Sequence, residues 1–429
     1  VFPLVHDNEQ RIHAAMQRRH LLCLALATAV VALPAASQQG KGPKTQVYID
    51  VATHHFAGMP DMGGMLGGLG GFMAKRMGGD TGPKGYPESR NIPAGTGRFL
   101  DVALYNGLKP GTEAQQLVPA GLAVGKSLPL LPPQPAGSRE SGSYDGKVPD
   151  VEMKIYQYWG CGAAVRPGQP KVFTFKMKKG QMQTSGSMAP GLFVPDRDID
   201  ATPSYAVWPN KKNTKRVSDR SSMIGAHQIT GDGVPESLKF DLTQNADFMP
   251  KIALQTRGEM TDSIGVSWQP VDRAKAYFLN AMAMQDERNF TVWSSAEVPG
   301  AGHELVNYLT GSYIDKWLKQ KVLLPSNATN CTVPKGIFAS SGSGQMGGMG
   351  MLTMIAYGPE TNIVYPPRPA DPKQPWNPEW NVRVRTKSTG SAMLGMDLSQ
   401  MQDMDRNDEE KPQDQKRPLR GLLKGLIGG

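Results

Sequence analysis

The sequence lacks the common signatures of catalysis. It contains no G-x-S-x-G, H-E-x-x-H or P-loop motif, which excludes the usual sequence patterns of α/β-hydrolases, zinc metalloproteases and P-loop NTPases. His227 and His303 are isolated, and a lone histidine is more often structural than catalytic. The sequence therefore favours a non-enzymatic protein, with an unrecognised hydrolase as the weakest alternative.

Long apolar runs are also scarce. The apolar run at residues 21–33 is shorter than the roughly 20 residues that a membrane-spanning helix needs, and no later run is longer. It follows a basic start at Met16 and precedes three small residues, 35–37. This is the three-part layout of a secretory signal peptide. We expect residues 16–37 to be the signal, and Arg18-Arg19 leave twin-arginine export open beside the Sec route.

Signal removal near Ser37-Gln38 would leave a periplasmic or secreted protein. Residues 1–15 carry no targeting pattern, and we interpret them as a spurious upstream extension. Cysteine is rare, with three in 429 residues, and Cys23 would leave with the signal. Cys161 and Cys331 then remain, 170 positions apart. An oxidising compartment favours a disulfide between them, worth about 4–5 kcal/mol in the chain-entropy model; two separate buried thiols are the alternative.

Charged residues make up 20% of the chain, and the formal net charge is +9. This basic balance favours anionic surfaces, but the charge is spread too thinly to indicate nucleic acid. One denser patch could bind an anionic glycan, although a solvated loop explains it as well. Its residues are Trp208, Lys211, Lys212, Lys215 and Arg216.

Alternating apolar residues dominate the rest of the chain and predict β-strands. Glycine (49 residues) and proline (35 residues) separate these segments, as turns require. Helical spacing occurs between His303 and Lys321, with a break expected at Gly311-Ser312. The expected strand faces are Val47-Ile49-Val51, Leu100-Val102-Leu104, Val151-Met153-Ile155, Val172 to Met177, Leu238-Phe240-Leu242, Ile264-Val266-Trp268, Phe290 to Trp293, Met351 to Tyr357 and Trp380 to Arg385.

One segment resembles a known family. Ile264-Gly-Val-Ser-Trp268 followed by Ala274-Lys-Ala-Tyr277 is similar to the fibronectin type III pattern. The resemblance covers residues 263–366 and implies that Trp268 packs against Tyr277 inside a two-sheet sandwich. The helical segment is an insertion that this family does not have. The whole pattern also looks like uncharacterised exported proteins of Gram-negative bacteria.

We therefore predict an all-β protein of two antiparallel β-sandwich modules, the second fibronectin type III-like, with a Gly/Met-rich loop and a disordered C-terminal tail. The expected divisions are N-terminal strands with Gly/Met/Pro-rich loops at 38–147, a first sandwich at 148–256, the fibronectin-like domain at 257–367, a closing strand at 368–396 and the tail at 397–429.

Methionine is unusually frequent, with 23 residues. Met59, Met62 and Met65 follow His54 and His55 closely, and soft thioethers of this kind bind Cu(I). Further methionine clusters occur at 346–354 and 393–404. In the first of these, Met351 and Met354 fit the core of a strand better than they fit a metal site. Methionine also fills gaps in apolar surfaces without binding a metal. We therefore expect no cofactor, with copper as the alternative.

Two further patterns carry weaker hypotheses. Asp196, Asp198 and Asp200 could hold calcium, but a solvated turn fits better because the rest of an EF-hand loop is missing. At the C-terminus, a short basic amphipathic helix could dock on an anionic membrane or a partner, or remain a frayed tail. Its residues are Leu419, Leu422, Leu423 and Leu426 with Arg420 and Lys424.

Together these features predict an exported, non-enzymatic protein with a binding or structural role at the cell envelope. The alternative is a Met-rich periplasmic copper-binding protein. The expected partners are an envelope component, an anionic glycan or another exported protein, with possible peripheral membrane contact through the C-terminus and no nucleic acid.

Overall fold

The computed structural model describes residues 42–57, 86–90, 96–133, 150–179, 181–215, 217–286, 288–339, 349–371 and 373–394. All of them belong to one compact unit, which begins at Gly42. This unit is mostly β-structure, as the alternating pattern predicts. No helix in these ranges is long and apolar enough to cross a membrane.

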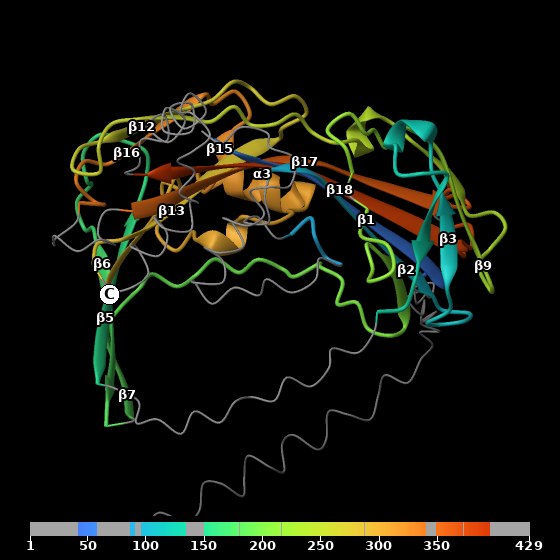
Figure 1. The fold of residues 1–429 in the computed structure, drawn as a ribbon, viewed down its shortest axis with the longest axis horizontal. Helices are drawn as coiled ribbons and strands as arrows, with labels where there is room; N and C mark the ends of the chain where they lie inside the picture. Colours follow the sequence, from blue (N-terminus) through green and yellow to red (C-terminus); the bar gives the residue numbers. More distant parts are fainter. Residues whose placement is uncertain are drawn as a thin grey trace, which may run out of the picture. The chain divides into compact units, whose positions relative to one another are not determined.

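An eleven-stranded mixed sheet forms the centre of the fold (Figure 1). Its two parallel contacts join β1 to β18 and β5 to β14, and its other neighbours are antiparallel. Ten strands lie side by side, and β15 (Leu324–Pro325) pairs with β13. Their order is β7 (Gln181–Gly186), β6 (Lys171–Lys178), β5 (Val151–Trp159), β14 (Asn289–Ser294), β13 (Ala276–Met284), β17 (Met349–Tyr365), β18 (Trp380–Leu394), β1 (Thr45–Phe56), β2 (Gly97–Asn106) and β8 (Tyr205–Trp208). Each of the four predicted divisions between residues 38 and 396 contributes at least one strand to this sheet.

Two small sheets cover one face of the large sheet at different places. The four-stranded sheet packs on β18, β1, β2 and β8, and the three-stranded sheet packs on β14, β13, β17 and β18. The first contains β10 (Lys239–Leu242), β9 (Gly225–Gly231), β3 (Ala114–Leu117) and β4 (Ser127–Leu130); the second contains β11 (Gln255–Arg257), β12 (Ile264–Ser267) and β16 (Asn330–Val333). Two apolar cores result, and the long strand β18 contributes to both.

Strand β17 changes register between these two regions. Tyr357 pairs with Lys387, but Glu360 pairs with Arg385, so β17 has one extra residue at a β-bulge. Gly358 lies in this bulge, where an added Cβ would come within 2.5 Å of the Met249 sulfur. A side chain at this position would clash, which explains the glycine.

The opposite face of the large sheet carries the 3-10 turn η4 (His303–Leu305) and α3 (Gly311–Lys319), the one α-helix in the described part of the chain. The other two 3-10 turns, η2 (Ala120–Leu122) and η3 (Gln244–Ala246), contribute Leu122 and Ala246 to the core beneath the four-stranded sheet. Thr310 caps α3 by accepting a hydrogen bond from the Tyr313 amide. Ile314 and Trp317 pack on β13 and β17. The expected helical segment is confirmed, with its break at residues 306–310 rather than at Gly311-Ser312.

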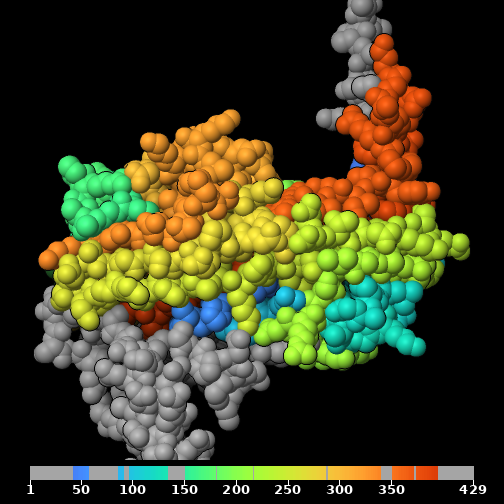
Figure 2. All heavy atoms as spheres, turned by 90° about the horizontal axis from the view of Figure 1, so that it is seen from above, coloured from blue at the N-terminus to red at the C-terminus, as the bar shows by residue number. Residues whose placement is uncertain are grey.

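Figure 2 shows the segment around α3, in orange, as a raised part of the surface beside the green residues that follow β5. The Arg166–Glu297 ion pair joins the chain after β5 to the segment between β14 and η4. The predicted disulfide between Cys161 and Cys331 is present. It ties the chain after β5 to β16, and so the large sheet to the three-stranded sheet.

Candidate functional site

Charged side chains line the middle of the large sheet on the face that also carries α3. Strand β18 alternates strictly: Val382 and Val384 enter an apolar core, whereas Arg383, Arg385 and Lys387 point to the other face. Each of these three basic residues is 5% exposed or less. Burial of this kind requires partners, because an isolated buried charge is costly.

Cross-strand pairing supplies the first partners. Asp50 of β1 lies directly opposite Arg385 in the parallel pair and opposite Asp101 in the antiparallel pair. Glu360 of β17 lies on the other side of Arg385. One row across four strands therefore reads Asp101, Asp50, Arg385, Glu360.

The centre of this row is a bidentate ion pair. Arg385 Nε and Nη2 donate to the two Asp50 oxygens at 2.7 and 2.6 Å, the strongest geometry for this pair. Burial acts to raise the pKa of the Asp50 carboxyl, but Arg385 and Arg90 outweigh it and hold that pKa below its usual value. Asp50 therefore stays ionised.

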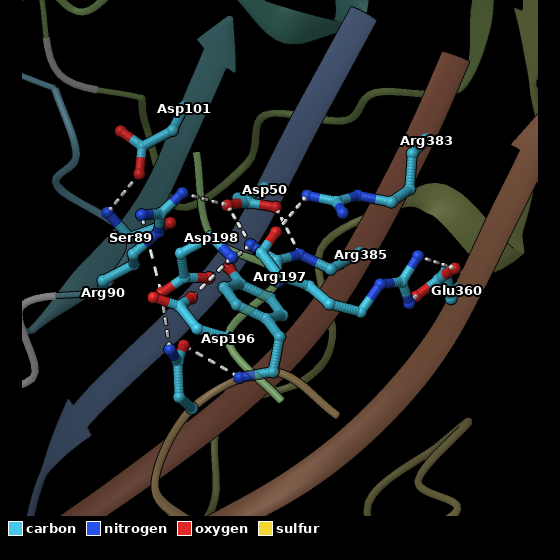
Figure 3. Close-up of polar contacts among 12 residues, drawn as sticks. Asp50, Ser89, Arg90, Asp101, Asp196, Arg197, Asp198, Glu360, Arg383 and Arg385 are labelled. Carbon is cyan, nitrogen blue, oxygen red and sulfur yellow. Dashed lines mark hydrogen bonds and ion pairs between the residues drawn. The ribbon is translucent and has the colours of Figure 1, made fainter. Parts of the chain in front are cut away.

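Two loops add further charges above this pair (Figure 3). Arg90 Nη2 donates to Asp50 at 3.1 Å. Asp198 accepts from Arg385 at 2.9 Å and from Asn307 at 2.7 Å. We name Asp50, Arg90, Asp198 and Arg385 the ionic cluster. It ties the chain at 86–90, 196–198 and 307–308 onto the two central strands.

Asp101 has a different environment from Asp50. Its two oxygens accept the backbone amides of Glu88 and Ser89, both at 2.8 Å. Burial raises the pKa of Asp101 to about 7, although these hydrogen bonds act to lower it, and the neighbouring Asp50 charge adds to the rise. Two carboxylates directly opposite each other thus differ in ionisation, since like charges at this spacing repel.

Lys387 is the least satisfied charge of the group. Its Nζ lies 4.5 Å from the centroid of the Tyr308 ring and has no hydrogen-bond acceptor among the described residues. Burial lowers the pKa of Lys387 to about 7, so a large fraction of this amine is neutral near pH 7. Arg385 contacts the same ring at 4.4 Å, so Tyr308 covers both cations.

A small cavity lies beside the ionic cluster. Its volume is about 10 Å3, room for about one water molecule. Arg385, Arg197, Glu360, Tyr308 and Tyr313 contribute to its lining. The ionic cluster is therefore closed and internally paired in this conformation, which is the arrangement of a structural network.

The sequence-predicted residues lie mostly elsewhere. Asp198 was expected in a solvated turn but belongs to the ionic cluster, with its side chain 19% exposed. Trp208 is 1% exposed in the core, so it adds no ring to the predicted anionic-ligand patch; Lys211, Lys212 and Lys215 are exposed. His227 is buried, with both ring nitrogens engaged by Gln116 and Met223, which fits a structural role.

Of the predicted copper ligands, the structure describes only the two histidines. Both ring nitrogens of His54 are engaged, by Thr389 at 2.6 Å and by the Ser89 carbonyl at 3.0 Å. Burial lowers the pKa of His54 to about 3, and His55 is half-buried. The residues outside the described ranges are Met59, Met62, Met65, Arg216, the signal at 16–37 and the C-terminal residues Leu419, Arg420, Leu422, Leu423, Lys424 and Leu426.

No group of three or more His, Cys, Asp or Glu side chains in the described ranges is arranged to hold a metal ion. Comparison with known proteins adds no family. No protein-family model matches the chain, and neither the curated proteins nor the solved structures contain a significant match.

Sequence reasoning missed the ionic cluster, although one signal was present. The segment Val382-Arg-Val-Arg-Thr-Lys387 alternates apolar and basic residues, which places three cations on one face of a strand. The three basic side chains of such a strand must either face solvent or be buried against acidic side chains. The sequence did not show which of these holds, because Asp50 and Asp198, the acids that pair with Arg385, lie 335 and 187 residues away.

Proposed function

We propose that this chain is exported and acts, without catalysing a reaction, as a β-sandwich binding or structural protein of the cell envelope. The observation that carries this proposal is the Cys161–Cys331 disulfide. Such bonds form and persist in oxidising compartments, which agrees with the signal-like segment at 16–37. The internally paired ionic cluster supports a scaffold role, because its acids and bases satisfy one another.

The fibronectin type III resemblance is part of this proposal. Strands β14, β13, β17 and β18 lie in one sheet and face β11, β12 and β16 in another. Trp268 and Tyr277 meet between these sheets, with ring centroids 5.6 Å apart. This pairing supports a fibronectin-like module over 263–366, and the four-stranded sheet with its own core supports a second sandwich. Modules of this kind serve as spacers and binding platforms, and the fold alone does not fix the ligand.

Export is tested by expressing the full chain in a Gram-negative host and separating the cell fractions. We expect the mature protein outside the cytoplasm, beginning near Gln38 by N-terminal sequencing, with thiols that react with a maleimide only after reduction. A matched variant without residues 16–37 should stay in the cytoplasm. An uncut leader in the cytoplasmic fraction, with Cys161 and Cys331 both reactive before reduction, would overturn the proposal.

Binding is tested with isolated cell-wall sacculi and anionic liposomes. Exposed Lys211, Lys212 and Lys215 predict retention that salt weakens, because contacts between exposed charges are screened. Changing all three to Gln should reduce retention. The matched control changes Lys171, Lys178 and Lys239, three exposed lysines elsewhere, to Gln. Equal retention by the two variants would show that the lysine patch is not the contact.

A second variant addresses the C-terminus. Removal of residues 416–429 should weaken retention on anionic liposomes if the basic amphipathic segment docks there. If the truncated and full-length proteins bind liposomes equally, the C-terminal docking hypothesis fails while the lysine patch remains testable.

A further inference from the structure

Three methionines from distant parts of the sequence meet in one row of the large sheet. Met282 of β13 lies directly opposite Met351 of β17, and Met351 lies directly opposite Met393 of β18. We name these three residues the methionine row. The methionine clusters that the sequence places at 346–354 and 393–404 thus converge here, and Met282 joins them from outside both.

The three side chains point to the same face of the sheet. Their strand neighbours Ala283, Leu352 and Ala392 enter the core beneath the three-stranded sheet. Because side chains alternate along a strand, the methionines point to the opposite face. Met282 is 39% exposed, and Met351 and Met393 are half-buried. All three residues are therefore partly exposed to solvent.

The spacing suits a single ion. Directly opposite residues on neighbouring strands have Cβ atoms about 4.5–5.5 Å apart. A metal–sulfur bond of about 2.3 Å, the zinc–thiolate length, places two sulfurs on one ion roughly 4 Å apart. Methionine has three rotatable side-chain bonds, so the outer two side chains can lean toward Met351.

The surroundings select the kind of ion. The neighbouring row on one side contains Asn280, Thr353 and Ser391, and on the other side Met284 lies opposite Met349. All five of these residues are neutral. Lys387, on the same face of β18, is six residues from Met393, a distance of roughly 20 Å along a strand. Three neutral thioethers without a carboxylate disfavour hard divalent cations and favour a soft monovalent one.

We infer that Met282, Met351 and Met393 form a binding site for one Cu(I) ion. This inference does not rest on the proposed function, since it concerns only the three sulfur atoms. It also differs from a site at Met59, Met62 and Met65, because it uses other residues.

The test is anaerobic Cu(I) titration of the full-length protein in competition with a chromogenic Cu(I) chelator. We expect one Cu(I) per chain at the methionine row. Changing Met351 to Leu should weaken that affinity at least about 10-fold. Mutation of residues that only support a metal's ligands already lowers metal affinity by about 10–100-fold, and Met351 would be a ligand itself. The triple change of Met282, Met351 and Met393 to Leu should abolish the site.

Leucine keeps the volume and the apolar character of methionine, so these variants remove sulfur and leave an apolar surface intact. The matched control is Met354→Leu, on the same strand but 0% exposed in the core, and its affinity for Cu(I) should equal that of the wild type. A second control changes Met59, Met62 and Met65 to Leu and should keep the methionine-row site.

A second readout is the NMR spectrum of protein labelled with 13C in the methionine methyl groups. Added Ag(I), a redox-inert soft monovalent ion, should shift three methyl signals that the triple variant lacks. Unchanged affinity and stoichiometry in the triple variant would overturn the inference, as would loss of all binding in the Met59, Met62 and Met65 variant alone. Failure of the wild type to compete with the chelator would also overturn it.

Discussion

The two ends of β18 carry opposite chemistry on the same face of one sheet. Near its start, Arg383, Arg385 and Lys387 are buried beneath loops that supply acids and an aromatic ring. Near its end, Met393 lies in the methionine row and is half-buried. The difference shows that buried charges require covering loops that supply opposite charges, whereas apolar side chains can stay half-exposed without such partners.

The effect of a substitution on stability should differ between the two ends of β18. At the charged end, removal of one partner leaves a buried charge unpaired, which is expensive. At the methionine end, flexible apolar side chains tolerate replacement by residues of similar volume.

Replacement of Arg385 by Met should destabilise the protein most. Asp50 would keep only the 3.1 Å contact with Arg90, and breaking a buried pair costs about 3–5 kcal/mol. Urea unfolding would measure this free energy. The double variant Asp50→Leu, Arg385→Met should lose clearly less than the sum of the two single changes, because the partners are coupled. Additive losses would contradict a buried ion pair.

Loss of the disulfide should affect mainly the methionine end. Changing Cys161 and Cys331 to Ser should lower the free energy of unfolding by about 2–5 kcal/mol. Hydrogen exchange should accelerate more in β12 and β16, which the bond anchors, than in β1 and β2. Equal acceleration everywhere would show that the two ends unfold as one cooperative unit.

Replacement of Lys387 by Met should stabilise the protein by about 1–4 kcal/mol at pH 7 or below, as replacing buried charges with apolar residues often does. The folded-state pKa is about 7 against the ordinary 10.5, so between these values the unfolded state binds a proton that the folded state does not. Wild-type stability should therefore rise from about pH 7 to pH 10.5, and the advantage of the variant should shrink over that range.

Unfolding curves at several pH values would show this trend. The control Lys239→Met, at an exposed position of β10, should change stability by less than about 0.5 kcal/mol at every pH. A pH-independent effect of Lys387→Met would mean that its amine keeps an ordinary pKa.

Replacement of Met282 by Leu should have the smallest effect, within about 0.5 kcal/mol, because the residue is partly exposed. Met354→Ala on the neighbouring strand β17 should cost about 2–5 kcal/mol, because that side chain is 0% exposed in the core. Thermal unfolding of both variants would compare the two faces directly. A large loss from Met282→Leu would show that the methionine row is a packed core.

The amino-acid sequence alone predicted nine strand faces, all of which lie in or next to observed strands, but it did not predict short strands such as β3, β4, β8 and β9. Val47, Ile49 and Val51 are all 0% exposed, as their alternation predicts, because side-chain direction along a strand is a local property. It also predicted the disulfide that the structure contains, because Cys161 and Cys331 are the two cysteines outside the expected signal.

Which strands lie side by side depends on the packing of the whole fold and could not be predicted from the sequence. The contacts of Asp50 with Arg385 and of Met351 with Met393 depend on pairing between distant strands, and alternation is the same whichever partner a strand has. The ionic cluster and the methionine row are both products of that pairing. Their residues could be assigned to a face from the sequence, but not to each other, because long-range strand pairing is set by the packing of the whole sheet.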